Sequence, residues 1–114
     1  MIEVQLEREL SENATCVLHY GWNTESVILN RPKFKVKLVK FFNNKAKLHL
    51  EPGVAYFIIY LMTGNKDDTV KVKAKYKKNP LDLTETEVDL LPEIKLTKNG
   101  QRIDDSRTFK IEGE

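Results

Sequence analysis

The sequence predicts an all-β protein, folded as a single antiparallel β-sandwich or a partly open barrel of seven to nine strands. Apolar and polar residues alternate with a period of two along most of the chain, and each alternating run ends at a turn signal. No run shows a convincing helical period. The 114 residues, 40% apolar and 32% charged, suit one domain with one hydrophobic core. We therefore expect a single β domain that spans residues 1–114.

The N-terminal part of the chain contains two expected strands. Residues 2–10 place apolar side chains on one face and three glutamates on the other, so the outer face of this strand is acidic. Residues 15–22 form the second strand, and residues 26–30 are a candidate continuation of it. Gly21 lies near the end of residues 15–22, where it weakens the strand and can let the chain bend.

The third expected strand, residues 34–42, alternates apolar residues with lysines until the phase shifts at Leu38-Val39. A β-bulge at this pair explains the shift, and so does burial of both faces. Asn43-Asn44 then predicts a two-residue hairpin turn, because Asn tolerates the positive φ that both central positions require. The hairpin would pair residues 34–42 with the next strand, residues 45–50.

The most apolar run of the chain follows the Pro52-Gly53 turn and is expected to be a central strand, residues 54–62. A loop at residues 63–68 separates it from residues 69–77, where small apolar residues alternate with lysines. The Asn79-Pro80 pair ends this strand, because Pro has no backbone donor.

The C-terminal third is less regular. Its first part predicts a strand interrupted by a loop, with four apolar residues: Leu81, Leu83, Val88 and Leu90. Asn99-Gly100 predicts a hairpin between residues 94–97 and residues 102–103. Phe109 and Ile111 indicate a last short strand.

Charge is segregated along the chain as minus, plus, minus. Residues 31–78 carry thirteen Lys or Arg and three acids, a net of +10, whereas residues 1–30 and 79–114 each carry a net of −4. When the central segment is placed on its expected strands, its lysines form two rows. The apolar residues that alternate with these lysines are expected to face the core. The candidate partner-binding lysines are Lys33, Lys35, Lys37, Lys40, Lys71, Lys73, Lys75 and Lys77.

Three interpretations of these lysines are open. In the first, acidic strands lie beside basic ones and the charges pair across the sheet. In the second, the lysines bind an acidic protein partner. In the third, they bind nucleic acid through phosphate contacts that are unspecific and sensitive to salt. Single-strand binders add exposed aromatic side chains, whereas Phe34 and Tyr76 fall on the apolar faces of their strands, which weakens the third interpretation.

The aromatic pair Tyr20 and Trp22 is a further candidate site. If Trp22 lies in a loop, the pair can form a platform for a sugar or peptide; if it lies on a strand, it packs in the core. The sequence favours core packing for this only Trp of the chain.

The chain has no signature of an enzyme, a metal site or a cofactor site. Only His19, His49 and the single Cys16 could supply nitrogen or sulfur ligands, and the spacing of Cys16 and His19 puts them on opposite faces of a strand. No glycine-rich phosphate loop and no nucleophile elbow occurs. We expect no catalytic residue, no cofactor and no metal.

The stretch Leu50-Glu51-Pro52-Gly53-Val54-Ala55-Tyr56 resembles the Leu-x-Pro-Gly-x-x-Tyr signature of fibronectin type III domains. In that family the Tyr braces a corner between sheets, and its hydroxyl can hydrogen-bond to the corner backbone. Trp22 resembles the core Trp of the family's second strand. The resemblance covers residues 2–77, lacks one family strand and implies an immunoglobulin-like sandwich.

Together these observations predict a binding module that is not an enzyme and that docks onto a larger protein. Lysine- and asparagine-rich composition suits an accessory, inhibitory or structural protein of a phage or mobile element. The alternative function is nucleic-acid binding through the two lysine rows. The longest apolar run has nine residues, fewer than the ~20 of a membrane helix, and no signal peptide is evident, so we expect a cytoplasmic protein that binds no membrane. Pairing of an edge strand with a second copy is a further expectation.

Overall fold

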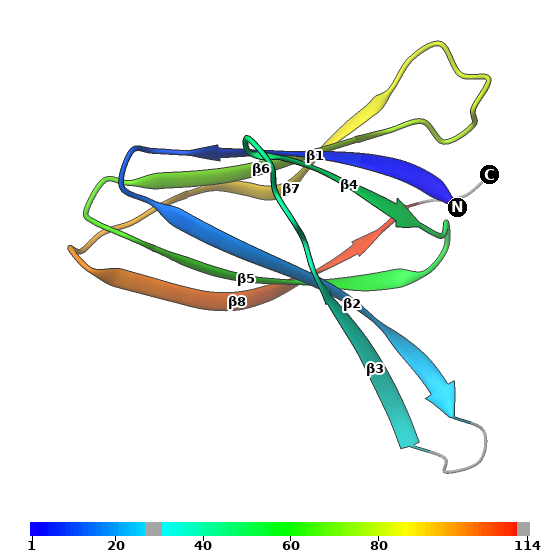
Figure 1. The fold of residues 1–114 in the computed structure, drawn as a ribbon, viewed down its shortest axis with the longest axis horizontal. Helices are drawn as coiled ribbons and strands as arrows, with labels where there is room; N and C mark the ends of the chain where they lie inside the picture. Colours follow the sequence, from blue (N-terminus) through cyan, green and yellow to red (C-terminus); the bar gives the residue numbers. More distant parts are fainter. Residues whose placement is uncertain (27–30, 112–114) are drawn as a thin grey trace.

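The computed structural model describes residues 1–26 and 31–111, and its regular structure is entirely β-strand (Figure 1). Eight strands are present in these residues. In chain order they are β1 (Ile2–Leu10), β2 (Thr15–Ser26), β3 (Arg31–Leu38), β4 (Lys45–Leu50), β5 (Ala55–Gly64), β6 (Thr69–Tyr76), β7 (Thr86–Lys95) and β8 (Gln101–Lys110).

The strands form two antiparallel sheets of four, here called sheet I and sheet II. Sheet I has the order β4-β1-β6-β7, and sheet II has the order β3-β2-β5-β8. The two sheets are not joined into a closed barrel, so of the two predicted architectures the sandwich is confirmed. Both ends of β1 and β4 agree with the predicted ranges, and β2 extends beyond residue 22 to Ser26. The rest of the expected continuation, residues 27–30, lies outside the described residues.

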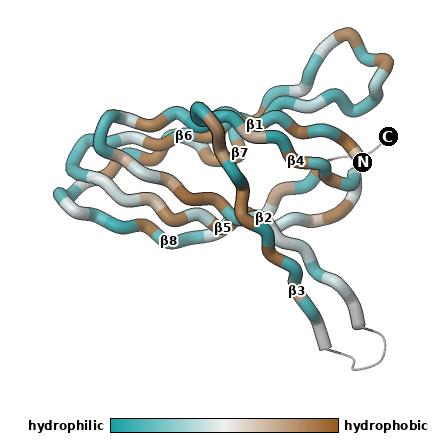
Figure 2. Tube along the Cα trace, viewed as in Figure 1, coloured by the Kyte–Doolittle hydropathy of each residue, from teal (hydrophilic) through white to brown (hydrophobic). Residues whose placement is uncertain are grey.

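The core lies between the sheets and follows from the alternation along each strand. Val4 and Leu6 of β1 and Val72 of β6 point inward from sheet I, and Leu18 and Ile58 point inward from sheet II. Figure 2 shows hydrophobic and hydrophilic residues alternating along these strands. None of the described residues buries a charged or polar side chain in this core. The interior is therefore held together by apolar packing.

Tyr56 braces the corner where the chain enters β5. Its ring is buried, and its hydroxyl oxygen accepts a hydrogen bond of 2.8 Å from the backbone N–H of Glu51. Gly53 provides the turn between them with a φ of 81° and donates its N–H to the carbonyl of Ile111. The corner predicted from the Leu50 to Tyr56 motif is therefore present.

The predicted third strand is too long at its C-terminal end. β3 ends at Leu38, and the chain then crosses from sheet II to sheet I. Val39 is buried and donates its N–H to the carbonyl of Leu18. The phase shift at Leu38-Val39 thus marks a change of sheet, and the bulge interpretation is wrong.

The tight turn predicted at Asn43-Asn44 is present, but the predicted pairing of the strands on either side of it is wrong. Both residues have positive φ, 51° and 61°, as the tight turn requires. Only the single bridge between Phe42 and Lys45 connects the two arms. β4 pairs with β1 instead, because its inner residues complete the core of sheet I.

The hairpin predicted at Asn99-Gly100 is also wrong, although Gly100 has the expected positive φ of 68°. β7 belongs to sheet I, whereas β8 pairs with β5 of sheet II along ten residue positions. Leu96 is buried between them, and its backbone exchanges hydrogen bonds with Asp67 and Asp68 of the β5–β6 loop. The turn therefore carries the chain across the end of the sandwich.

Two smaller expectations about the C-terminal third need correction. Leu81 and Leu83 are exposed in the loop between β6 and β7 and belong to no strand, because the β7 ladder begins only at Thr86. The last strand is long and ends at Lys110. Its length follows from the full-length pairing with β5.

Replacing Tyr56 by Phe tests the corner. The Tyr56→Phe variant leaves the Glu51 N–H without its partner, so we expect a loss of about 1–2 kcal/mol in the free energy of unfolding, measured by urea denaturation. Tyr60→Phe is the matched control, because the Tyr60 hydroxyl makes no hydrogen bond to the described residues, and it should change stability by less than about 0.5 kcal/mol. Equal effects of the two variants would contradict the assigned corner.

Candidate interaction surface

The lysines of β6 lie in the middle of sheet I, on its outer face, with an acidic strand on each side. On the β1 side, Glu9 faces Lys71 and Glu7 faces Lys73. The Nζ atom of Lys73 lies 3.4 Å from a carboxylate oxygen of Glu9. The Glu9 charge, a hydrogen bond to it and the Glu87 charge raise the pKa of Lys73.

Strand β7 supplies acids on the other side of β6. Asp89 lies 3.7 Å from the Nζ of Lys71, and Glu87 lies 3.9 Å from the Nζ of both Lys73 and Lys75. The cross-strand pairing of basic and acidic strands is thus present for β6. Three of its lysines face acids of the chain itself and are poorly suited to hold a second anionic molecule. Lys77 follows the end of β6 and is exposed.

The lysines of β3 have a different environment, because β3 is an edge strand of sheet II. Among the strands of the described residues, its only neighbour is β2. Lys37 faces Tyr20, Lys35 faces Trp22 and Lys33 faces Thr24, so the ladder partners from β2 include no acid. All three lysines are exposed, and none forms an ion pair with the described residues. The two lysine rows lie in different sheets and do not line one groove.

Trp22 is half-buried at the margin of the core. Its ring stacks on Tyr20 with a centroid distance of 5.9 Å and meets Tyr56 edge-on at 6.1 Å. The Nζ of Lys37 lies 5.7 Å from the Trp22 ring centre, within the range of a cation–π interaction. Tyr20 and Trp22 are therefore strand residues that support the lysine-bearing face of β3, and they do not form a platform in a loop.

The apolar side of β3 faces solvent, which corrects the expectation that it faces the core. Phe34, Val36 and Leu38 are 57%, 51% and 50% exposed. The phase shift explains this orientation: Val39 is buried in the core, so the apolar residues in the opposite phase before it point outward. Phe34 is exposed on the face opposite to the lysines of its own strand.

The apolar side of β3 continues across β2 and β5. Val36 faces Gly21, which in turn faces Phe57. The rings of Phe34 and Phe57 meet edge-on with a centroid distance of 5.6 Å, which places both on this side of the sheet. We call this outer apolar face of sheet II the apolar surface. Its residues are Val17, Phe34, Val36, Leu38, Phe57, Ile59 and Leu61.

Gly21 has a packing role in the middle of this surface. A Cβ atom at Gly21 would lie 2.6 Å from the carbonyl oxygen of Lys35 and 3.1 Å from the Val36 Cγ2 atom. Only a residue without a side chain lets Val36 lie this close to β2. The sequence interpretation of Gly21 as a weak point in the strand is therefore incomplete.

Polar side chains of β8 border the apolar surface on the side away from β3. Thr108 faces Phe57, and Ser106 faces Ile59. His19 also lies on this face, half-buried between Leu38 of β3 and Ile59 of β5. A largely apolar centre with a polar margin is the arrangement found in protein–protein interfaces. The sequence contained a signal for this surface, since residues 54–62 are apolar on both faces although the core covers only one.

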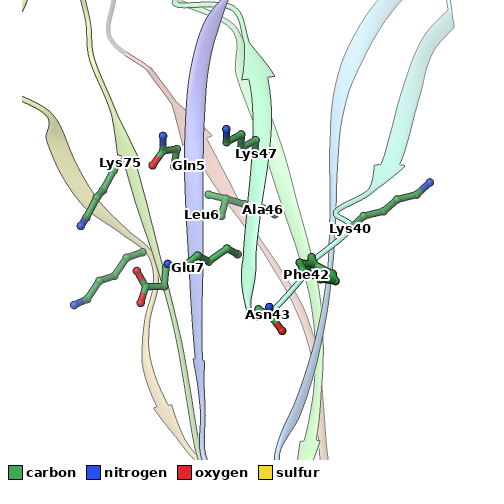
Figure 3. A pocket seen from close by; sticks show the side chains of 11 residues that line it. Gln5, Leu6, Glu7, Lys40, Phe42, Asn43, Ala46, Lys47 and Lys75 are labelled. Carbon is green, nitrogen blue, oxygen red and sulfur yellow. The ribbon is translucent and has the colours of Figure 1, made fainter.

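A pocket of about 650 Å³ opens beside β1 and β4, near the crossing segment between the sheets (Figure 3). Lys40, Lys47, Lys75 and the exposed Phe42 are among its lining residues. In Figure 3 the side chains of Lys40 and Lys75 point away from each other. Their amines do not converge on one point, so the arrangement is not that of an anion-binding site.

Cys16 is buried in the core beneath the sheet, and burial raises the pKa of its thiol to about 11, while the charge of Arg8 acts in the opposite direction. A nucleophilic cysteine needs a lowered pKa. The described residues contain no group of three or more His, Cys, Asp or Glu side chains that could hold a metal ion. Within the same residues there is no helix with the length and hydrophobicity that crossing a bilayer requires.

Comparison with known proteins identifies no relative. No protein-family model, no curated protein and no solved structure gives a significant match to this chain. The proposals below therefore rest on the residues and geometry described above.

The different surroundings of the two lysine rows predict different effects of charge reversal. Lys73→Glu places a third acid between Glu9 and Glu87, so we expect a lower urea midpoint, with a smaller difference at high salt. Lys35→Glu is the matched control, because Lys35 faces Trp22, and its midpoint should be unchanged. Equal losses of stability in the two variants would contradict the distinction.

The pKa of Cys16 predicts a loss of stability at alkaline pH. The unfolded thiol ionises near its ordinary pKa of 9.0, whereas the folded thiol stays protonated to about pH 11. Between these values the unfolded state holds fewer protons, so the free energy of unfolding falls as pH rises. The fall should be about 2 kcal/mol larger than in Cys16→Ala, measured by urea denaturation from pH 8 to 11. Parallel pH curves for the two proteins would refute the prediction.

Proposed function

We propose that this protein is a non-enzymatic binding module that docks onto a larger protein partner through the apolar surface of sheet II. The observation that supports this most directly is the exposure of Phe34, Val36 and Leu38 beside the half-buried Phe57 and Ile59 on one face. Contiguous apolar patches on a protein surface commonly mark interaction sites. Aromatic side chains at the centre of such a patch often contribute much of the binding energy.

The contrast between the two sheets supports the same proposal. The outer face of sheet I carries charges that pair with each other, for example Lys47 with Glu3 and Lys73 with Glu9. Such a face is well solvated and gains little from contact with another protein. On the outer face of sheet II the ion pair between Arg102 and Asp104 lies on the marginal strand β8, and the described residues of β3, β2 and β5 form no such network there. This face leaves apolar area in water, which association would bury.

An immunoglobulin- or fibronectin-like identity and an accessory or inhibitory role are part of this proposal. The corner at Tyr56 supports the identity, since the hydroxyl contact to Glu51 is the bond that the family motif implies. Sandwiches of this kind commonly act as binding modules, although fold alone does not determine function. The exposed lysines of β3 lie on the opposite face of the same edge strand, and a partner that also reaches this edge would be favoured if it carried acidic groups.

The apolar surface can be tested first without a partner. The double variant Phe34→Ser, Leu38→Ser should bind clearly less of a fluorescent apolar probe such as bis-ANS, because two of its most exposed apolar side chains are gone. The matched control, Leu83→Ser, removes an even more exposed residue, 98% exposed, from a loop outside the surface. It should leave probe binding unchanged.

A pull-down from the native host then tests the function with the same proteins. We expect wild type and Leu83→Ser to retain the same partner in reciprocal tagging experiments and the double variant to lose it. Circular dichroism must show equal folding of the three proteins. A partner retained equally by the double variant would refute the proposed surface, and a nucleic acid recovered in its place would favour the alternative function.

A further inference from the structure

The outer side of β3 is an open sheet edge. β3 pairs with β2 and with no other strand of the described residues. Figure 1 shows β3 and the end of β2 projecting away from the rest of the sandwich. An open edge presents unpaired backbone donors and acceptors to solvent and can accept another strand.

The hydrogen-bond phase of the β2–β3 ladder identifies which residues present those groups. Val39 donates its N–H to the carbonyl of Leu18, and the same register pairs Lys37 with Tyr20. In an antiparallel ladder, residues that exchange hydrogen bonds alternate with residues whose backbone groups point to the other side. The backbone N–H and C=O groups of Lys33, Lys35 and Lys37 therefore bond to β2. The residues that alternate with them direct their backbone N–H and C=O groups to the open edge. These residues are Phe34, Val36 and Leu38.

The position of Pro32 agrees with this phase. It lies on β3, two residues before Phe34, so its backbone nitrogen is directed to the open edge. Pro has no N–H to donate and is found in sheets where that group would face outward. The donors of the open edge therefore begin at Phe34.

The side chains along this edge require a partner of particular chemistry. One face of the edge carries Lys33, Lys35 and Lys37, and the other carries apolar side chains. The second lysine row lies on β6, an inner strand of sheet I with acidic strands on both sides, and β1 beside it alternates acidic with apolar residues. β3 has the lysine row without such a neighbour among the described residues.

We infer that β3 accepts an extended segment of the partner protein as a fifth strand of sheet II, one in which acidic residues alternate with apolar residues. The inference rests on the proposed function and specifies how the partner binds. The acidic side chains lie beside Lys33, Lys35 and Lys37, and the apolar ones extend the surface formed by Phe34 and Val36. Backbone hydrogen bonds to the open edge supply affinity, and the alternation supplies specificity.

A second copy of this chain fits the edge less well. Antiparallel pairing of β3 with β3 of another copy, about an axis perpendicular to the sheet, places two lysine rows on the same face. Adjacent like charges oppose such pairing. A dimer is therefore an outcome that would contradict the inference.

Synthetic peptides test the inference directly. A seven-residue peptide of alternating Glu and Val, with blocked ends, should shift the backbone amide NMR signals of Phe34, Val36 and Leu38 in a saturable manner. A peptide of alternating Lys and Val should bind at least about tenfold more weakly, since like charges then face each other. A block peptide of the same Glu and Val composition removes the alternation and should also bind weakly.

Two variants of the protein separate the charge contact from the backbone contact. Lys35→Glu with Lys37→Glu should reverse the preference, so that the Lys-Val peptide binds more tightly than the Glu-Val peptide. Val36→Pro removes an N–H that points to the open edge and no bond to β2, so it should abolish binding of the Glu-Val peptide. Val36→Thr is its control, because it keeps the N–H and should keep most of the affinity.

The outcomes distinguish this inference from the proposed function. Absence of binding at about 1 mM Glu-Val peptide, or binding unchanged by both Val36→Pro and the charge reversal, overturns strand addition. The proposed function still stands in that case if Phe34→Ser, Leu38→Ser abolishes partner capture. A concentration-dependent dimer in light scattering that Val36→Pro removes overturns the inference in favour of a second copy.

Discussion

The period of two along a β-strand, against which the apolar pattern of the sequence changes phase at Leu38-Val39, is the constraint on which the rest of this structure depends. Each strand has one inward and one outward set of side chains, and a shift of one residue exchanges them. Because Val39 is buried in the core while Leu38 faces solvent, the apolar residues of β3 lie outside the sandwich and their lysine alternates lie on the side of Trp22. The same shift is the point at which the chain leaves sheet II for sheet I.

Charge pairing between neighbouring strands accounts for the strand order of sheet I and contributes little to that of sheet II. The order β4-β1-β6-β7 places basic, acidic, basic and acidic outer faces side by side, so neighbouring strands attract each other and strands of equal charge are kept apart. The minus, plus, minus charge pattern along the chain thereby favours the observed order of strands in sheet I. In sheet II the lysine row of β3 lies at an edge, where the described residues place no acidic strand beside it, and that row is available to another molecule.

The centre of the apolar surface lies on β5, a strand that the core and two neighbouring strands hold in place. β5 lies inside sheet II between β2 and β8, its inner residues Ile58 and Met62 are fully buried, and the Tyr56 corner anchors its start. Its outer residues Phe57 and Ile59 are therefore held in place by the core beneath them. β3 lies beside β2 in this sheet, with Gly21 allowing the close approach of Val36. The part of the apolar surface on β5 is thus supported by the core, and such support lowers the conformational entropy lost on binding.

The sequence by itself determined the fold class, the ranges of β1 and β4, the tight turn at Asn43-Asn44 and the Tyr56 corner, because alternation, turn chemistry and a corner motif act over a few neighbouring residues. It could not determine which strands pair, so the ladder expected after β3 and the hairpin expected at Asn99-Gly100 proved wrong, and the apolar side of β3, expected to face the core, proved to face solvent. Pairing joins residues that are distant along the chain and depends on which apolar faces complete a common core. Only the tertiary structure decided that sheet I covers one side of β5 and leaves Phe57, Phe34 and Val36 in solvent.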